Sequence, residues 1–259
     1  MLRGLRAPQC IICMLGLATC AGCRSAREPA PTGEPPSRAA SVATAAPAPA
    51  PASATASATA AKLAWGFDSD GAGSAPLHFS FGRTGSGRPG RWLIQAEADA
   101  PSPPNVLAQL DADATDYRFP IAVADAPALR DLRVSVRCRT ISGRVDQACG
   151  LVFRYRDENN YYLTRANALE NNIRLYYVKD GKREQIASSS TRVTPRAWHL
   201  LGVEARDDRV RVYWDEREIV DHSDSTFRDA GRVGVWTKAD SVTSFDDLDV
   251  TPLAVPGSP

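Results

Sequence analysis

The amino-acid sequence predicts an all-β domain, either a sandwich or a barrel, between Lys62 and about Thr251. Apolar runs of roughly four to eight residues recur there, and glycine, aspartate, asparagine and proline separate them. No long stretch repeats its apolar residues with the 3.6-residue period of a helix. Between Gly150 and Tyr177, apolar and polar residues alternate, which indicates strands that bury one face and leave the other free.

Residues 1–23 are typical of a targeting segment, with a basic start and an apolar run that is too short to span a bilayer. Ala21-Gly22-Cys23 resembles the lipobox of bacterial lipoproteins and predicts that Cys23 is lipidated. Cys20 is an alternative anchor, because Leu17 stands three residues before it. Cleavage by an ordinary signal peptidase is a second alternative.

Residues 24–61 consist mainly of alanine, proline, serine and threonine. Such a segment buries too little apolar surface to offset the entropy of ordering, so we expect a disordered tether, and a disordered tail at 253–259. A lipid anchor followed by a tether predicts an exported protein that is held on the bacterial cell envelope and touches the membrane only through its lipid.

The charge balance gives no reason to expect a nucleic-acid partner. The chain has 31 basic and 30 acidic residues, a net charge of +1. Arginine supplies nearly all of the positive charge, which suits sugars and carboxylates but is also the bias of a GC-rich genome. We expect a monomer.

The first predicted hairpin turns at Gly143-Arg144, with glycine in the first turn position. In this register three apolar pairs share one face: Val134 with Phe153, Val136 with Leu151, and Cys138 with Cys149. The last pair predicts a disulfide in an exported protein, with two free thiols as the alternative. The cysteine spacing does not fit a zinc site.

Three further hairpins follow from the turn residues. Residues that face each other across a hairpin have sequence numbers with a constant sum, and this sum sets each register. A turn at 157–160 places Phe153 opposite Thr164. The pair Asp180-Gly181 is typical of a type I′ turn and places Leu175 opposite Ile186. A turn at Asp207-Asp208 pairs Val203 with Val212 and Leu201 with Trp214. Strands at 233–238 and 245–250 complete the domain, and we expect 65–67 to pair near the last of them.

Two segments carry a family resemblance. The run GLVFRYRDENNYYLTRANALENNIRLY at 150–176 and GVWTKADSVTSFDDL at 234–248 resemble the concanavalin A-like lectin/glucanase superfamily. Within it they are most similar to bacterial envelope domains related to the 3-keto-disaccharide hydrolase domain. Trp92, Asp99-Ala-Pro101, Tyr117 and Trp198 fit as well, so the resemblance covers residues 65–250. It implies a jelly roll of two antiparallel sheets, the concave one carrying any carbohydrate site.

The candidate binding face combines aromatic rings with amide, guanidinium and other charged groups. Aromatic rings pack on the apolar face of a sugar, and the polar groups hydrogen-bond its hydroxyls. Its predicted members are Arg154, Arg165, Asn167, Arg174, Tyr176, Trp236, Lys238 and Asp240, with Glu170 and Asn171-Asn172 at the rim. Trp236→Ala is expected to weaken sugar binding without unfolding. The alternative is that the arginines are merely solvated and paired with one another.

Catalytic and metal signatures are weak. The E-x-D-x-x-E motif of retaining glucanases of this fold is absent, and no catalytic residue is predicted. His78, His199 and His222 show no metal spacing. No cofactor is expected, although Asp68-Ser-Asp70-Gly71 and Asp246-Asp247 supply oxygen ligands suited to calcium.

Three hypotheses therefore remain for the function. The first is a non-catalytic module that binds carbohydrate or a glycoconjugate. The second is a glycoside hydrolase that resembles 3-keto-disaccharide hydrolases, with Glu170 or Asp240 as its acid or base. The third is a structural adhesion module, which would have no pocket.

Overall fold

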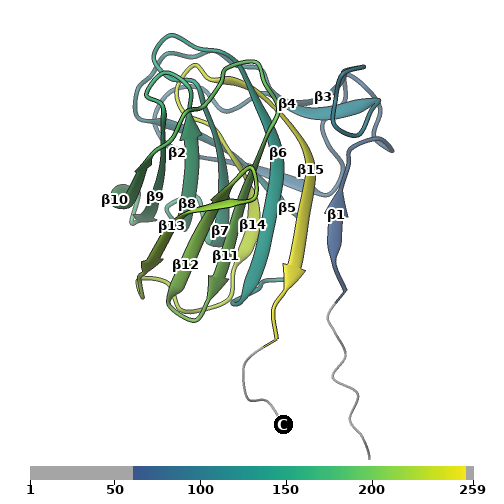
Figure 1. Cartoon of the computed structure of the whole chain (residues 1–259). Helices are drawn as coiled ribbons and strands as arrows, with labels where there is room; N and C mark the ends of the chain where they lie inside the picture. Colours follow the sequence, from purple (N-terminus) through teal and green to yellow (C-terminus); the bar gives the residue numbers. More distant parts are fainter. Residues whose placement is uncertain (1–60, 255–259) are drawn as a thin grey trace, which may run out of the picture. The chain divides into compact units, whose positions relative to one another are not determined.

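The computed structural model describes residues 61–254, which form two antiparallel β-sheets packed face to face (Figure 1). The described part of the chain contains no helix, and thus no apolar helix of membrane-spanning length. The targeting segment, Cys20, Cys23, nearly all of the predicted tether and residues 255–259 lie outside the described residues.

Sheet A contains eight strands. In spatial order they are β13 (Arg217–Ser223), β12 (Arg209–Trp214), β11 (His199–Arg206), β6 (Leu132–Ser142), β15 (Val242–Pro252), β4 (Asn105–Gln109) and β3 (Trp92–Ala96), with β1 (Leu63–Trp65) paired to β15. The expected pairing of the first strand with the last is confirmed, since Trp65 lies opposite Leu248.

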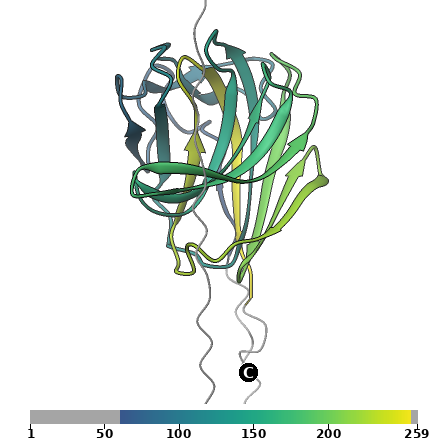
Figure 2. The same ribbon diagram turned by 90° about the vertical axis from the view of Figure 1, so that its left-hand side faces the viewer.

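Sheet B contains seven strands. In spatial order they are β10 (Lys182–Ser190), β9 (Asn172–Lys179), β8 (Asn160–Asn167), β7 (Ala148–Asp157), β14 (Arg232–Trp236), β5 (Arg118–Ala124) and β2 (Phe79–Gly85). Strands distant in sequence lie side by side in both sheets, which is the jelly-roll connectivity that the resemblance implies. Figure 2 shows the two layers from the side that carries β10 and β13.

The main core lies between the sheets. Alternate residues of β6 face it, so Val134, Val136 and Cys138 are buried while Ser135 and Arg137 between them are not. From sheet B the alternate residues Leu151 and Phe153 enter the same cluster. Each fully buried aliphatic or aromatic side chain contributes about 1.5–3 kcal/mol to folding, and this core supplies the main driving force.

Two predicted turns are confirmed. Around Asp207-Asp208, Val203 pairs with Val212 and Leu201 with Trp214, as expected. Asp180 and Gly181 have φ angles of 50° and 75°, the left-handed pair of a type I′ turn. Near the turn the predicted register holds, but a bulge follows Gln185, so Leu175 lies opposite Ala187 instead of Ile186.

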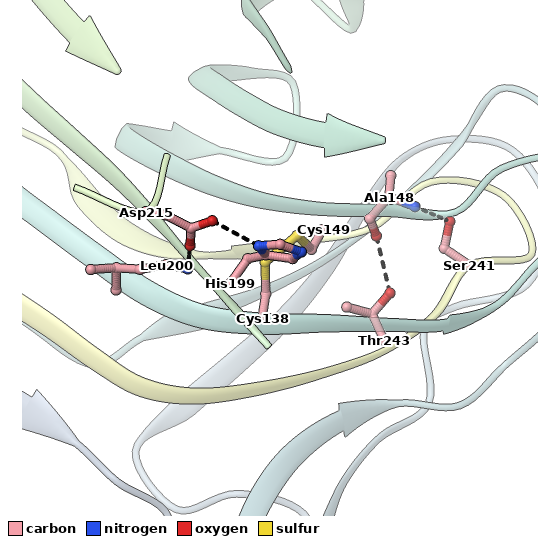
Figure 3. Close-up of a disulfide and its surroundings, with 8 residues drawn as sticks. All are labelled: Cys138, Ala148, Cys149, His199, Leu200, Asp215, Ser241 and Thr243. Carbon is pink, nitrogen blue, oxygen red and sulfur yellow. Dashed lines mark hydrogen bonds and ion pairs between the residues drawn. A yellow bond between two sulfur atoms is a disulfide. The ribbon is translucent and has the colours of Figure 1, made fainter. Parts of the chain in front are cut away.

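The hairpin predicted around Gly143-Arg144 is wrong. Strand β6 pairs with β11 and β15 in sheet A, whereas β7 pairs with β8 and β14 in sheet B. The 143–147 segment therefore crosses from one sheet to the other. Cys138 and Cys149 nevertheless form a disulfide, because the core-facing residues of the two strands meet across the sandwich (Figure 3).

Candidate functional site

The face of sheet B that points away from the main core carries a second buried cluster. Its apolar members include Phe119, Val152, Leu163, Tyr176 and Trp236. The β9–β10 turn lies against the segment before β5, because Tyr117 Oη donates to the carbonyl of Gly181 at 3.0 Å. Sheet B is thus curved onto this face, and its middle is filled with side chains.

Trp236 lies on the predicted face, but its side chain is wholly buried. Its ring packs on Phe119 with centroids 5.3 Å apart. Above this pair, the Arg183 guanidinium lies 4.5 Å from the Phe119 ring and 4.7 Å from the Tyr176 ring. The interpretation of Trp236 as an open aromatic plate is therefore wrong, because its neighbours on the curved sheet cover the ring.

Arg154 does not belong with the other predicted site residues. Gly150 of β7 lies opposite Arg165, and Arg154 is four residues further along, in a bulge with a φ of 46°. Its buried guanidinium donates to the carbonyls of Arg130, Phe227 and Asp207 at 2.6–2.9 Å. Arg154 therefore ties loops together and offers no donor to a ligand.

The same bulge explains the register error in the 157–160 hairpin. Asp157 lies opposite Asn160 at the turn, as the constant sum requires. Beyond the bulge the pairing moves by two residues, so Phe153 lies opposite Tyr162 instead of Thr164.

Most of the other predicted residues meet in one polar network at the rim of sheet B. At its centre, Arg165 donates to Asn172 Oδ1 at 2.5 Å, to Glu170 Oε2 at 2.9 Å and to Tyr176 Oη at 3.1 Å. Arg174 lies 3.3 Å from the same Glu170 oxygen. Because β8 ends and β9 begins at this edge, both arginines share one carboxylate.

A second half of the network surrounds Lys238. Its Nζ lies 3.0 Å from Asp146 Oδ2 and 2.6 Å from Asp116 Oδ1, and Asn167 donates to the other Asp146 oxygen at 2.7 Å. Burial raises the pKa of Asp146 although Lys238 acts against it. Burial acts to lower the pKa of Lys238, but Asp116 and Asp146 outweigh it and raise that pKa. We call the nine residues of the two halves the rim cluster: Asp116, Asp146, Arg165, Asn167, Glu170, Asn172, Arg174, Tyr176 and Lys238.

Asp240 shapes the loop beside the rim cluster. Its carboxylate accepts the backbone N–H groups of Arg144, Val145 and Asp146 at 2.7–3.2 Å. Burial acts to raise its pKa, but these donors prevail and lower it. Asp240 thereby places Asp146 beneath Lys238, and its own oxygens are occupied.

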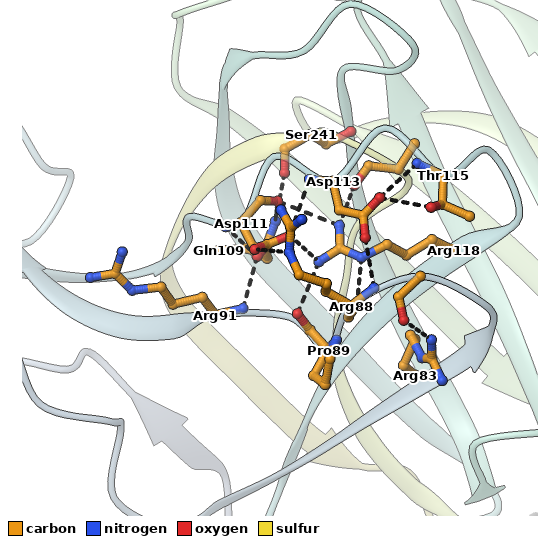
Figure 4. A network of polar contacts seen from close by, with 12 residues as sticks. Arg83, Arg88, Pro89, Arg91, Gln109, Asp111, Asp113, Thr115, Arg118 and Ser241 are labelled. Carbon is orange, nitrogen blue, oxygen red and sulfur yellow. Dashed lines mark hydrogen bonds and ion pairs between the residues drawn. The ribbon is translucent and has the colours of Figure 1, made fainter.

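Buried Arg118 fixes the opposite side of the site (Figure 4). Its guanidinium donates to the carbonyls of Arg88 and Pro89, to that of Ala239 next to Lys238, and to Asp111 Oδ1. Burial lowers its pKa although Asp111 acts against it. The loop before Asp116 and the segment after Lys238 are therefore held by one side chain.

The rim cluster reaches solvent on one side. Arg174 and Glu170 have side chains 32 % and 40 % exposed, whereas Arg165 and Asp146 are buried beneath. Three large apolar residues close in sequence to its members are also exposed: Tyr117, Val145 and Leu169. Charged forks and amides beside apolar side chains can bind the hydroxyls and the ring face of a sugar.

Sequence reasoning missed Asp116, Asp146 and the apolar residues around the rim. No local pattern marks the two aspartates, since they become partners of Lys238 only through long-range folding. Exposed Leu169 carries a local signal, because it is the apolar residue of the turn that joins β8 to β9.

The aspartates suggested for calcium are in contact with other parts of the chain. Three of the four accept a backbone N–H group, Asp68 from Asn105, Asp70 from Leu77 and Asp246 from Ser102, and Asp247 lies 3.8 Å from Arg137 Nε. Within residues 61–254 no group of three or more His, Cys, Asp or Glu side chains is arranged to hold a metal ion.

Comparison with known proteins gives one short sequence match. No protein-family model matches the chain. A segment of 92 residues is 32 % identical to the levanase of Bacillus subtilis (strain 168). The match spans 34 % of this chain and only 13 % of the levanase.

Three solved structures are similar in fold to this chain. The carbohydrate binding module CBM66 from Bacillus subtilis matches with a TM-score of 0.53 and 21 % identity, over 66 % of this chain and 94 % of that one. A Bacillus subtilis protein of unknown function with a galectin-like fold matches with a TM-score of 0.51 and 11 % identity, over 71 % and 99 % of the two chains. The VIP36 exoplasmic/lumenal domain in its Ca2+/Man-bound form matches with a TM-score of 0.51 and 13 % identity, over 76 % and 92 %.

These likenesses establish the fold. The domain has a two-sheet jelly-roll fold like those of CBM66, the galectin-like protein and the VIP36 domain, as the sequence resemblance implies. The finer resemblance to 3-keto-disaccharide hydrolases stays a prediction.

Proposed function

We propose that this protein is a lipid-anchored envelope protein that binds a polysaccharide at the rim cluster without cleaving it. The observation that carries the proposal is the convergence of Arg165, Arg174 and Lys238 on three carboxylates, with Tyr176 beneath and exposed apolar residues beside them. Buried Arg165 Nε has no acceptor within the described residues, and a ligand hydroxyl reached by a small rearrangement would satisfy it.

The relatives support a carbohydrate ligand and suggest which to test first. One similar structure is called a carbohydrate binding module, another is bound to Man, and the sequence relative is a levanase. Levan is therefore the first candidate ligand. The anchor at Cys23, or the alternative at Cys20, is part of the proposal and rests on the sequence pattern alone.

The two acids named for the hydrolase alternative, Glu170 and Asp240, do not have the pKa that a general acid needs. Burial acts to raise the pKa of Glu170, but Asn172, Arg165 and Arg174 prevail and lower it. The pKa of Asp240 is lowered too. A general acid in glycoside hydrolysis needs a raised pKa.

The test compares two arginines whose side chains reach solvent. Arg174→Gln removes a guanidinium group of the rim cluster, whereas Arg156→Gln removes an arginine of β7 that pairs with Asp229. Losing a hydrogen bond from a charged donor costs about 1.5–3 kcal/mol, so Arg174→Gln should weaken binding by about tenfold or more. Arg156→Gln should bind like the parent protein.

Binding is measured by calorimetry against a panel that begins with levan and includes other neutral polysaccharides, with and without calcium. Equal weakening by the two variants would contradict the proposal. So would the absence of binding across the whole panel. Release of sugar from any bound polysaccharide would instead favour the hydrolase alternative.

A further inference from the structure

A groove lies where the edges of the two sheets meet, and one end of it adjoins the β8–β9 turn that carries Glu170 of the rim cluster. Strand β10 is the outer strand of sheet B and β13 that of sheet A, and they lie along the same side of the sandwich (Figures 1 and 2). Two hollows of about 570 Å³ and 580 Å³ open there and share Ser190, Thr191 and Arg192. They form one continuous groove beside the linker from β10 to β11.

Two arginines of this groove have no carboxylate partner among the described residues. Arg192 and Arg217 line the second hollow and are exposed. Within residues 61–254 neither guanidinium has a carboxylate within 4.0 Å, although most arginines there are paired. The aspartate of the groove, Asp215, is committed, since His199 Nδ1 and the Leu200 N–H both lie 2.9 Å from its carboxylate (Figure 3).

Glu218 is the other acid of the groove, and it is also partnered. Its Oε2 lies 3.5 Å from Tyr213 Oη and 3.8 Å from Arg211 Nε. An anion that enters the groove therefore meets two free cations, while both carboxylates already face other groups.

The rest of the groove supplies hydroxyl groups. Ser189 and Thr191 line it with their hydroxyl oxygens 2.9 Å apart, and Ser190 lines it as well. Trp214 also borders the groove, but its side chain is only 6 % exposed and packs in the main core, where its indole stacks on His199. Hydroxyl groups of the protein exchange hydrogen bonds with those of a sugar.

We propose that this groove binds a uronic-acid residue of an acidic polysaccharide, with Arg192 and Arg217 on its carboxylate and the hydroxyls of Ser189 and Thr191 near its ring. A planar guanidinium matches a carboxylate by paired hydrogen bonds, which makes this group the fitting anion. The inference does not rest on the proposed function of the rim cluster.

The test uses two polymers that differ only at the carboxyl group, which is ionised in polygalacturonate and a neutral methyl ester in its fully esterified form. The full-length protein should bind polygalacturonate at least tenfold more tightly than the ester in calorimetry. Arg192→Gln/Arg217→Gln should abolish that difference. Both side chains are exposed, so the melting temperature should not change.

A matched variant separates the groove from net charge. Arg91→Gln/Arg228→Gln also removes two exposed arginines without a described carboxylate partner, and it should retain the preference for polygalacturonate. Equal losses in the two double variants, or equal affinity of the parent for both polymers, would overturn the proposal. Arg174→Gln should keep polygalacturonate binding, so a failure of the rim-cluster proposal is distinguishable from a failure of this one.

Discussion

Cys138 on β6 and Cys149 on β7 are bonded across the interior of the sandwich, so one disulfide joins sheet A to sheet B. The residues are 11 apart in sequence, and the bond closes the loop that crosses between the sheets. Its sulfurs lie beside the His199–Asp215 pair (Figure 3).

Reduction should lower the free energy of unfolding. Closing a loop of this length stabilises a protein by about 3 kcal/mol in the chain-entropy model. Denaturant titrations with and without a thiol reductant measure the difference. Cys138→Ala/Cys149→Ala is the control and should not respond to the reductant. A parent protein equally stable in both conditions would contradict the expectation.

Trp236→Ala should unfold the domain more readily instead of acting on binding alone. The ring is fully buried against Phe119, and removing such a side chain costs about 3–5 kcal/mol. Denaturant titration should show this loss, and Trp236→Phe should lose less. Arg174→Gln, which removes a partly exposed side chain, should leave the stability nearly unchanged. An equally stable Trp236→Ala would mean that the ring is not part of the packing.

The sequence predicts on which face of a strand a side chain lies better than it predicts which other side chains cover it. The alternation along 150–177 assigns Arg165 and Tyr176 to the face opposite the main core, because side-chain direction depends only on local backbone geometry. Whether that face is open depends on the curvature of sheet B, which brings Arg183 over Phe119 and Tyr176. No local pattern encodes that curvature.

The Cys138–Cys149 pairing shows that sequence positions alone do not reveal which strands are neighbours in a sheet. A constant position sum describes residues that face each other across a hairpin, but it also describes two strands that face each other across a sandwich when a short loop joins them. The prediction of the disulfide is confirmed, while the strand pairing behind it is wrong. The bulge at Arg154 is not predicted either. Extra residues in one strand change the sum of facing positions, and no sequence signal marks them.

Gly231→Ala should be strongly destabilising, unlike Gly202→Ala. A Cβ at Gly231 would lie 2.3 Å from the Arg154 carbonyl carbon and 2.6 Å from the Tyr155 nitrogen, so the backbone of the bulge would have to move. Overpacking of this kind costs about 1–3 kcal/mol. At Gly202 the nearest atom is 3.4 Å away, an ordinary contact. Melting temperatures of the two variants test this, and equal values would contradict it.

Because Asp246 holds its proton more tightly in the folded state, the protein should become less stable as the pH rises through about 6. Its buried carboxylate accepts the Ser102 and Asp247 N–H groups at 2.9 Å and 2.8 Å. Burial raises its pKa to about 6, and Asp247 adds to the shift. An unfolded aspartate titrates near pH 3.9, so the folded state holds this proton more tightly. The stabilisation is complete below about pH 4 and is lost as pH rises through about 6.

Asp246→Asn isolates this effect from the other carboxylates. The unfolding free energy of the variant relative to the parent should rise between pH 4.5 and pH 7.5 by on the order of 2 kcal/mol. Asp99 is the control, because Arg139 lowers the pKa of its carboxyl and its stabilisation is lost as pH falls. The difference between Asp99→Asn and the parent should therefore stay nearly constant from pH 4.5 to pH 7.5 and change only below about pH 4, in the opposite direction. A difference for Asp246→Asn that stays constant over this range would show that the buried carboxyl titrates as it does in the unfolded chain.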